Sequence, residues 1–268
     1  MSRNLLLKEL RLNRASFLAW ALSLMALIVF TAAAMPAWIS NTAAMSAYMK
    51  ALPKALLNAM SVDLERIGDP LSVFVVYCML YTTLLGGLYA IGVFARTLHK
   101  EQAQHTAEFL MAKPLSRWDL FATKAAASLL QVLAMAALVS LTGFLCMAAF
   151  VPQDWSRAAF FTASLYQLLL MIAFGAMGLL VSLCAKRARS LTGPAMGIVL
   201  GFYLYDAACK MNDSYAWLAW LGPFKWMDTA VSAPGYGLEA WRVFLFLGVT
   251  AACLASSWLI YRRKDILG

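Results

Sequence analysis

The sequence is poor in charge. Only 13% of its 268 residues are Asp, Glu, Lys or Arg, and 63% are hydrophobic. A soluble domain carries about 25% charged and roughly 45–50% apolar residues. So little polar material cannot cover a water-soluble body of this size. Together with several long uncharged runs, the composition predicts an all-α polytopic membrane protein.

Several catalytic and cofactor motifs are also missing. The chain has no GxxxxGK[ST] phosphate-binding loop, no HExxH pair and no GxSxG elbow, which argues against an ATPase, a zinc protease or a hydrolase. Its two histidines are His99 and His105, and His105 with Glu108 would supply two zinc ligands where three or four are needed. The five cysteines form no CxxC pair. We expect no catalytic residue, no metal and no bound cofactor on this chain.

Uncharged runs place six transmembrane helices in a single domain covering residues 1–268. A run of about 20 apolar residues crosses the hydrocarbon. The fifth run is the shortest and is uncharged only from 190 to 205. The expected spans are approximately residues 17–38, 71–95, 121–150, 158–184, 190–209 and 243–261.

The charged residues fix the expected orientation. Segments that would be cytoplasmic in this arrangement hold 15 of the 22 Lys and Arg residues and 5 of the 13 Asp and Glu residues. Such a bias is typical of the positive-inside rule and predicts cytoplasmic amino and carboxyl termini. It also accounts for the net charge of +9 without a nucleic-acid partner.

Two connections between spans carry distinct signals. Residues 96–120 form a charged cytoplasmic loop, in which Ser116 and Asp119 have the spacing of a capping box and Pro114 stops any preceding helix. This pattern predicts a helix, a break and a new helix. Residues 210–240 are rich in tryptophan and are expected at the outer membrane interface.

A few residues within the spans are unusual for lipid surroundings. Asp206, beside Tyr203, is costly near a membrane and is a functional candidate by default, although an ion pair with Lys210 would explain it equally well. Gly86 and Gly87 predict a kink or a close helix approach. Two overlapping GxxxG steps in the fifth span are candidates for helix packing or dimerisation, at Gly193, Gly197 and Gly201.

The charged loop resembles a family motif. Membrane subunits of ABC-2-type ATP-binding-cassette transporters carry approximately G-T-x-E-x-L-L-x-x-P-x-S-R after the second span, and a basic residue several positions later. Residues 105–117 (HTAEFLMAKPLSR) and Lys124 match most fixed positions, with His105 in place of glycine and Met111 in place of leucine. Residues 221–228 (LGPFKWMD) and 261–265 (YRRKD) are similar to two further family segments.

The resemblance implies a permease subunit in the bacterial cytoplasmic membrane. Residues near 98–112 would form a coupling helix that docks on a separate ATPase subunit, which would bind ATP and magnesium. A second permease copy or a paralogue would complete a dimer, with membrane lipid around it. The expected docking residues are His105, Thr106, Glu108, Phe109, Leu110, Met111, Pro114, Ser116 and Arg117. Glu108 and Arg117 could instead pair within the loop and hold its shape.

The same resemblance implies a translocation path along the dimer axis, lined partly by the second and fifth spans. Candidate path residues are Gly86, Gly87, Tyr203 and Asp206. The family exports its substrates, and the apolar spans and aromatic outer segment would suit an amphipathic peptide, drug or lipid-like molecule.

Two other classes stay open. An intramembrane enzyme would use Asp206, Asp213 and Asp228 as acid groups, and metal content or turnover by the isolated chain would favour it. A secondary transporter would be expected to show an inverted repeat or several mid-membrane charges, and neither is visible.

Overall fold

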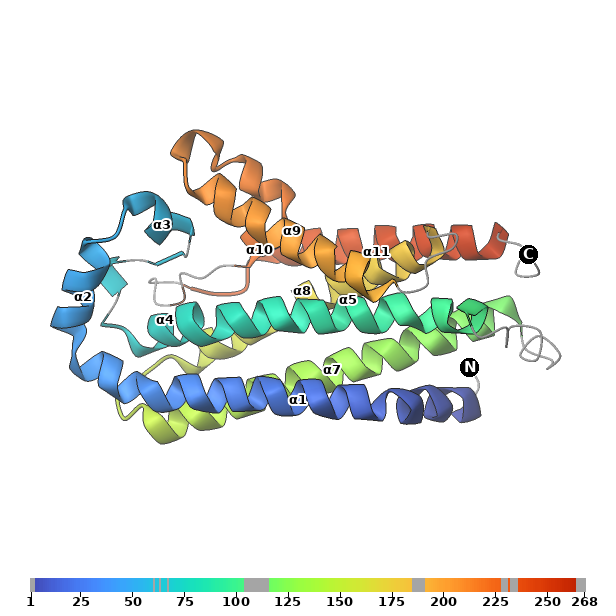
Figure 1. Ribbon diagram of the computed structural model, residues 1–268, viewed down its shortest axis with the longest axis horizontal. Helices are drawn as coiled ribbons and strands as arrows, with labels where there is room; N and C mark the ends of the chain where they lie inside the picture. Colours follow the sequence, from blue (N-terminus) through green and yellow to red (C-terminus); the bar gives the residue numbers. More distant parts are fainter. Residues whose placement is uncertain are drawn as a thin grey trace.

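The computed structural model is a bundle of long antiparallel helices (Figure 1). The structure describes residues 3–59, 61–62, 64–66, 68–103, 116–184, 191–227, 231 and 236–263. Within these ranges the regular elements are all helical. The long ones are α1 (Arg3–Ser40), α4 (Pro70–Phe74) continued into α5 (Leu80–Ala103), α7 (Arg117–Phe150), α8 (Arg157–Cys184), α9 (Thr192–Lys210) and α11 (Ala240–Arg263).

Short helices fill the connections at one end of the bundle. They are α2 (Thr42–Lys50), α3 (Lys54–Ala59), η1 (Leu64–Arg66), η3 (Asp213–Tyr215), η4 (Leu218–Leu221) and α10 (Pro223–Trp226). A π-helical turn, Val75–Met79, joins α4 to α5 without breaking the helix axis (Figure 1).

Five helices in the described chain are long and apolar enough to cross a membrane. These candidate spans are Asn4–Ser40, Pro70–Thr97, Arg117–Phe150, Arg157–Cys184 and Ala240–Arg263. The predicted all-α, multi-pass class is therefore confirmed. The 19-residue α9 stands at the place of the predicted fifth span but is not one of the five; its sequence contains Tyr203, Tyr205 and Asp206, which are all less apolar than the residues around them.

The long helices pack in sequence-distant pairs. Helix α5 lies against α8, α1 lies against α7, and α11 lies against α8. The closest approach depends on glycines of α8: a Cβ atom at Gly178 would lie 2.4 Å from the carbonyl oxygen of Ile91, and one at Gly175 would lie 2.8 Å from the Phe94 ring. Only residues without a side chain allow α5 and α8 to come this close.

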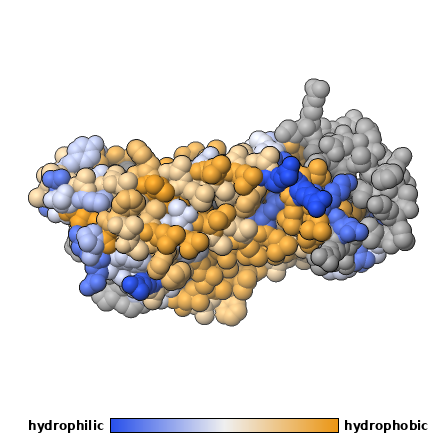
Figure 2. Space-filling view, turned by 90° about the horizontal axis from the view of Figure 1, so that it is seen from below, coloured by the Kyte–Doolittle hydropathy of each residue, from blue (hydrophilic) through white to orange (hydrophobic). Residues whose placement is uncertain are grey.

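The surface has the pattern expected of a membrane protein. Apolar residues cover the middle of the face shown in Figure 2, and polar residues gather toward its two ends. The start of α1 and the end of α11 lie at the same end of the bundle (Figure 1). We call this the basic end, because Lys8, Arg11, Arg117 and Arg262 belong to it.

Candidate functional site

Most of the predicted docking residues lie outside the described part of the chain. These are His105, Thr106, Glu108, Phe109, Leu110, Met111 and Pro114, so their docking role stays a prediction. The structure does describe the two ends between which this segment runs. Helix α5 is described to Ala103, and the chain resumes at Ser116 and Arg117.

Ser116 is the N-cap of α7. Its extended backbone (φ −69°, ψ 152°) precedes the helix, and its Oγ accepts a hydrogen bond from the Asp119 backbone N–H at 3.0 Å. The same hydroxyl donates to the Asp119 carboxylate at 2.6 Å. The predicted capping pair is present, and it gives α7 a defined first residue.

Arg117 and Trp118 fix the start of α7 to the end of α11. The Arg117 guanidinium donates to the Arg262 carbonyl oxygen at 3.2 Å, where the unpaired carbonyls of a helix C-terminus favour a cation. The Trp118 ring meets Trp258 edge to face at 4.7 Å between centroids, and Phe121 packs on Trp258 at 5.5 Å. Arg117 therefore has a structural partner within this chain, which the sequence does not indicate.

A buried ion pair joins α1 to α7 at the basic end. The Lys124 ammonium lies 3.5 Å from a carboxylate oxygen of Glu9, and the two side chains are only 1% and 9% exposed. Lys124 also donates to the Thr97 carbonyl oxygen at 2.9 Å. The Thr97 hydroxyl is 2.6 Å from the Ser128 hydroxyl. One cation thus connects α1, α5 and α7.

This junction brackets the predicted coupling segment. Thr97 lies immediately before residues 98–115, and Lys124 lies in the third turn of the helix that follows them. Because Lys124 bonds to Thr97 directly, the ends of α5 and α7 are held at a fixed separation. Helices α1, α5 and α7 therefore meet next to this segment.

Glu9 is a member of this junction that sequence reasoning missed. It reads in the sequence as a lone acid among basic residues. The usable signal is helical spacing: Leu5 and Glu9 are buried one turn apart on a face that continues to Ala21 and Leu24. An acid on the apolar face of a helix calls for a buried cationic partner, and the choice of Lys124 depends on the fold.

The opposite end of the bundle holds Asp206. Its carboxylate is buried and lies 2.6 Å from the Lys210 ammonium, one helical turn later. Lys210 also donates to the Ser61 hydroxyl at 3.0 Å, which ties α9 to the segment after α3. The Asp206 Oδ1 atom has no hydrogen-bond partner among the described residues. Of the two roles that the sequence left open, the ion pair with Lys210 is present.

The other path candidates lie in separate places. Tyr203 packs against the Phe224 ring at 5.6 Å in the C-terminal half of α9. Gly86 and Gly87 are buried in α5, where added Cβ atoms would lie 3.0 Å from Met171 Sδ and 3.1 Å from a Phe174 ring carbon of α8. The glycines therefore form a close helix contact. Their place on a translocation path stays a prediction.

The three glycines of α9 face away from the rest of the described chain. Added Cβ atoms at Gly193, Gly197 and Gly201 would meet no atom within 4 Å among the described residues. All three are exposed. The GxxxG face is thus not used for packing within the described chain and is free for contact with another helix.

The acid groups of the enzyme hypothesis are not seen together. Asp206 is paired with Lys210, Asp228 lies outside the described residues, and the structure does not describe the Asp213 side chain. Across the described ranges, no group of three or more His, Cys, Asp or Glu side chains is placed to hold a metal ion.

A family comparison identifies the chain. The sequence profile described as "ABC-2 family transporter protein" matches residues 3–266, which is nearly the whole sequence. The chain therefore belongs to the ABC-2 transporter family, as its loop motif indicates. No curated protein matches it significantly.

Proposed function

We propose that this member of the ABC-2 family is a permease subunit that exports an amphipathic peptide, drug or lipid-like substrate. The observation that carries the proposal is the family match over residues 3–266. Membership makes the chain a membrane component of an ABC transporter, and hydrolysis of ATP with magnesium belongs to a partner subunit. The proposed location is the bacterial cytoplasmic membrane.

Six spans with both termini in the cytoplasm agree with the helix arrangement. Because the start of α1 and the end of α11 lie at the same end (Figure 1), the chain crosses the bundle an even number of times. Five helices qualify as spans by length and hydropathy, and α9 supplies the sixth crossing. Its 19 residues measure about 28 Å at about 1.5 Å per residue, close to the ~30 Å hydrocarbon thickness.

Residues near 98–112 are proposed as the coupling helix, with Phe109, Leu110 and Met111 as its apolar docking cluster. The supporting observation is the junction of Glu9, Lys124 and Thr97 directly behind this segment. A coupling element needs a stiff base so that force from the ATPase moves helices instead of bending a loop. The buried ion pair and the Ser116 cap supply such a base.

A second permease, identical or a paralogue, is proposed to pack on α9. Support comes from the open glycine face at Gly193, Gly197 and Gly201, because small residues let helix backbones approach closely in a membrane. The translocation path would then run between the two copies along α5 and α9, and Tyr203 and Asp206 would lie at its outer end.

The experiment is co-purification of the tagged chain in detergent from its native host. We compare the wild type with a variant in which Phe109, Leu110 and Met111 are replaced by alanine. The control replaces three exposed apolar residues of the outer segment by alanine, at Trp217, Trp220 and Leu221. We expect an ATPase subunit with the wild type and the control, and its loss from the docking variant.

Two results would contradict the proposal. If the ATPase stays bound to the docking variant as tightly as to the wild type, the coupling site lies elsewhere. If the chain purifies alone and folded, with bound metal or an activity of its own, the permease function itself is wrong.

A further inference from the structure

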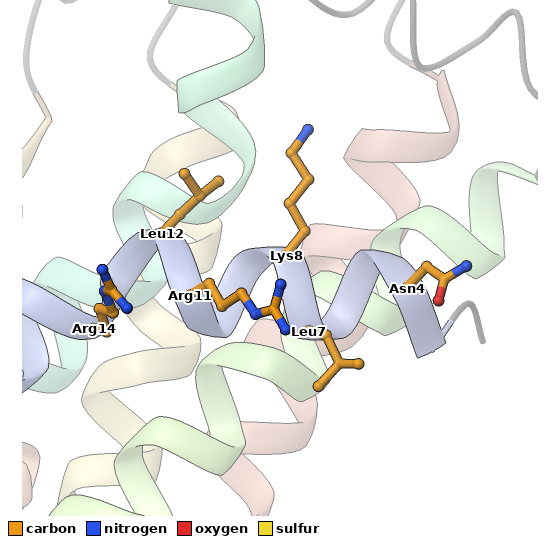
Figure 3. A pocket seen from close by; sticks show the side chains of 6 residues that line it. All are labelled: Asn4, Leu7, Lys8, Arg11, Leu12 and Arg14. Atoms are coloured by element: carbon orange, nitrogen blue, oxygen red, sulfur yellow. The ribbon is translucent and has the colours of Figure 1, made fainter.

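The first four turns of α1 border a basic pocket. It has a volume of about 590 Å3. In Figure 3, Lys8 and Leu12 extend from one side of α1, Leu7 extends from the other, and Arg11 lies between them. The described residues that line the pocket are Asn4, Leu7, Lys8, Arg11, Leu12 and Arg14.

The cations of this pocket are not neutralised by the rest of the described chain. Lys8, Arg11 and Arg14 are exposed and make no ion pair with any described residue. Glu9, the only acidic residue of α1, is buried on another face and is bound to Lys124. The pocket therefore presents three positive charges to whatever fills it.

The two arginines lie on the lipid-facing stripe of α1. Leu7, Arg11, Arg14, Leu18 and Leu22 follow one another at intervals of three or four residues, so they share one helix face. The leucines of this stripe are 41%, 55% and 62% exposed. In a membrane-spanning helix, such exposed leucines contact acyl chains. The same face becomes cationic toward the basic end.

The spacing of the arginines and leucines along the α1 axis fits one phospholipid. Arg14 and Leu22 are eight residues apart, or about 12 Å along the helix, and Arg11 lies about 4.5 Å beyond Arg14. A phosphate held at the arginines would place its own acyl chains along Leu18 and Leu22. An acidic protein would satisfy the charges but would leave this continuous apolar stripe unexplained.

We propose that Lys8, Arg11 and Arg14 form a binding site for the headgroup of an anionic phospholipid, whose acyl chains pack on Leu18 and Leu22. On the topology proposed above, the lipid belongs to the cytoplasmic leaflet. Basic residues at an anionic bilayer surface each strengthen binding about fivefold, equal to about 1 kcal/mol. Three of them together give a preference on the order of 100-fold over a zwitterionic lipid.

The test uses native mass spectrometry of the purified full chain in detergent, titrated with phosphatidylglycerol or phosphatidylcholine. The patch variant carries Lys8→Gln, Arg11→Gln and Arg14→Gln. The control variant carries Lys50→Gln, Lys54→Gln and Arg157→Gln, which remove the same charge from exposed positions at the opposite end. A third variant, Arg11→Lys with Arg14→Lys, keeps the charge. Phosphatidylglycerol binding is also measured at low and high salt.

We expect the wild type, the control and the charge-keeping variant to prefer phosphatidylglycerol strongly, and the preference to weaken in high salt. The patch variant should lose it by about 100-fold. If the patch variant fails to fold, single glutamine variants should each lose about fivefold. Lipid binding needs no ATPase, so this result is independent of the co-purification described above.

Three outcomes would overturn the proposal. One is equal phosphatidylglycerol binding by the patch and control variants. Another is conversion of the patch variant from dimer to monomer with its lipid preference intact, which would assign the face to a second copy. The third is loss of a co-purifying acidic protein, again with lipid binding unchanged.

Discussion

Replacing Lys124 by methionine is expected to destabilise the bundle by about 3–5 kcal/mol. Methionine keeps most of the apolar stem but removes the ammonium that lies 3.5 Å from Glu9. At an effective dielectric constant near 20, that attraction is about 5 kcal/mol before desolvation is counted. In the variant, the Glu9 carboxylate, whose side chain is only 9% exposed, loses this partner. The Thr97 carbonyl oxygen also loses its hydrogen bond from the ammonium.

Reversible unfolding in mixed detergent micelles would measure this loss through the fluorescence of the nine tryptophans. Lys54→Met is the matched control, because Lys54 is exposed at the opposite end and makes no ion pair with a described residue. The double variant Glu9→Gln with Lys124→Met should lose less than the sum of its single changes, since it leaves no buried charge unpaired.

The reasoning about the junction would be refuted by either of two results. The first is a Lys124→Met variant within about 0.5 kcal/mol of Lys54→Met, the range of ordinary surface substitutions. The second is strict additivity of the Glu9 and Lys124 changes, which would mean that the two side chains do not interact.

Further predictions use the same unfolding measurement. Ser116→Ala should cost about 1 kcal/mol, because α7 loses its N-cap; an unchanged midpoint would contradict this. Gly178→Ala should cost about 1–3 kcal/mol, since its Cβ would lie 2.4 Å from the Ile91 carbonyl oxygen. Gly248→Ala, on an exposed face of α11 away from the proposed α9 interface, has open space and should gain up to about 1 kcal/mol from helix propensity. Equal effects of the Gly178 and Gly248 changes would refute the close packing at Gly178. Lys210→Met should destabilise more than the double change with Asp206→Asn, and the reverse order would exclude the buried pair.

Composition and charge predict the class of this protein because membrane insertion acts on whole segments. In lipid, the backbone N–H and C=O groups of a segment must form hydrogen bonds within that segment. A sufficiently long uncharged run therefore predicts a transmembrane helix directly. The capping pair at Ser116 is equally local, because its partners are three residues apart. The family follows from a loop motif and is confirmed by the match over residues 3–266.

Contacts between helices were not predictable in the same way. The sequence marks Gly86 and Gly87, which do form a close contact with α8, and the regularly spaced Gly193 and Gly197, which do not pack within the described chain. The closest helix approach instead uses Gly175 and Gly178 of α8, which form no such pattern. The partner of Lys124 is 115 residues away in sequence, and periodicity places Glu9 on a buried face without indicating what covers it.

The Glu9–Lys124 and Asp206–Lys210 ion pairs differ in how they span the helices of the proposed transporter. Asp206 and Lys210 lie one turn apart on a single helix, so their attraction is kept when α9 moves as a rigid body. Glu9 and Lys124 lie on separate helices, so any motion that separates α1 from α7 must break an ion pair between two buried side chains. Such motion is costly, whereas α9 packs mainly on α5 and keeps an open face. If residues 98–115 transmit force, we therefore infer that α1, α5 and α7 move together with α8, which packs closely on α5, and that the rearrangement falls at α9.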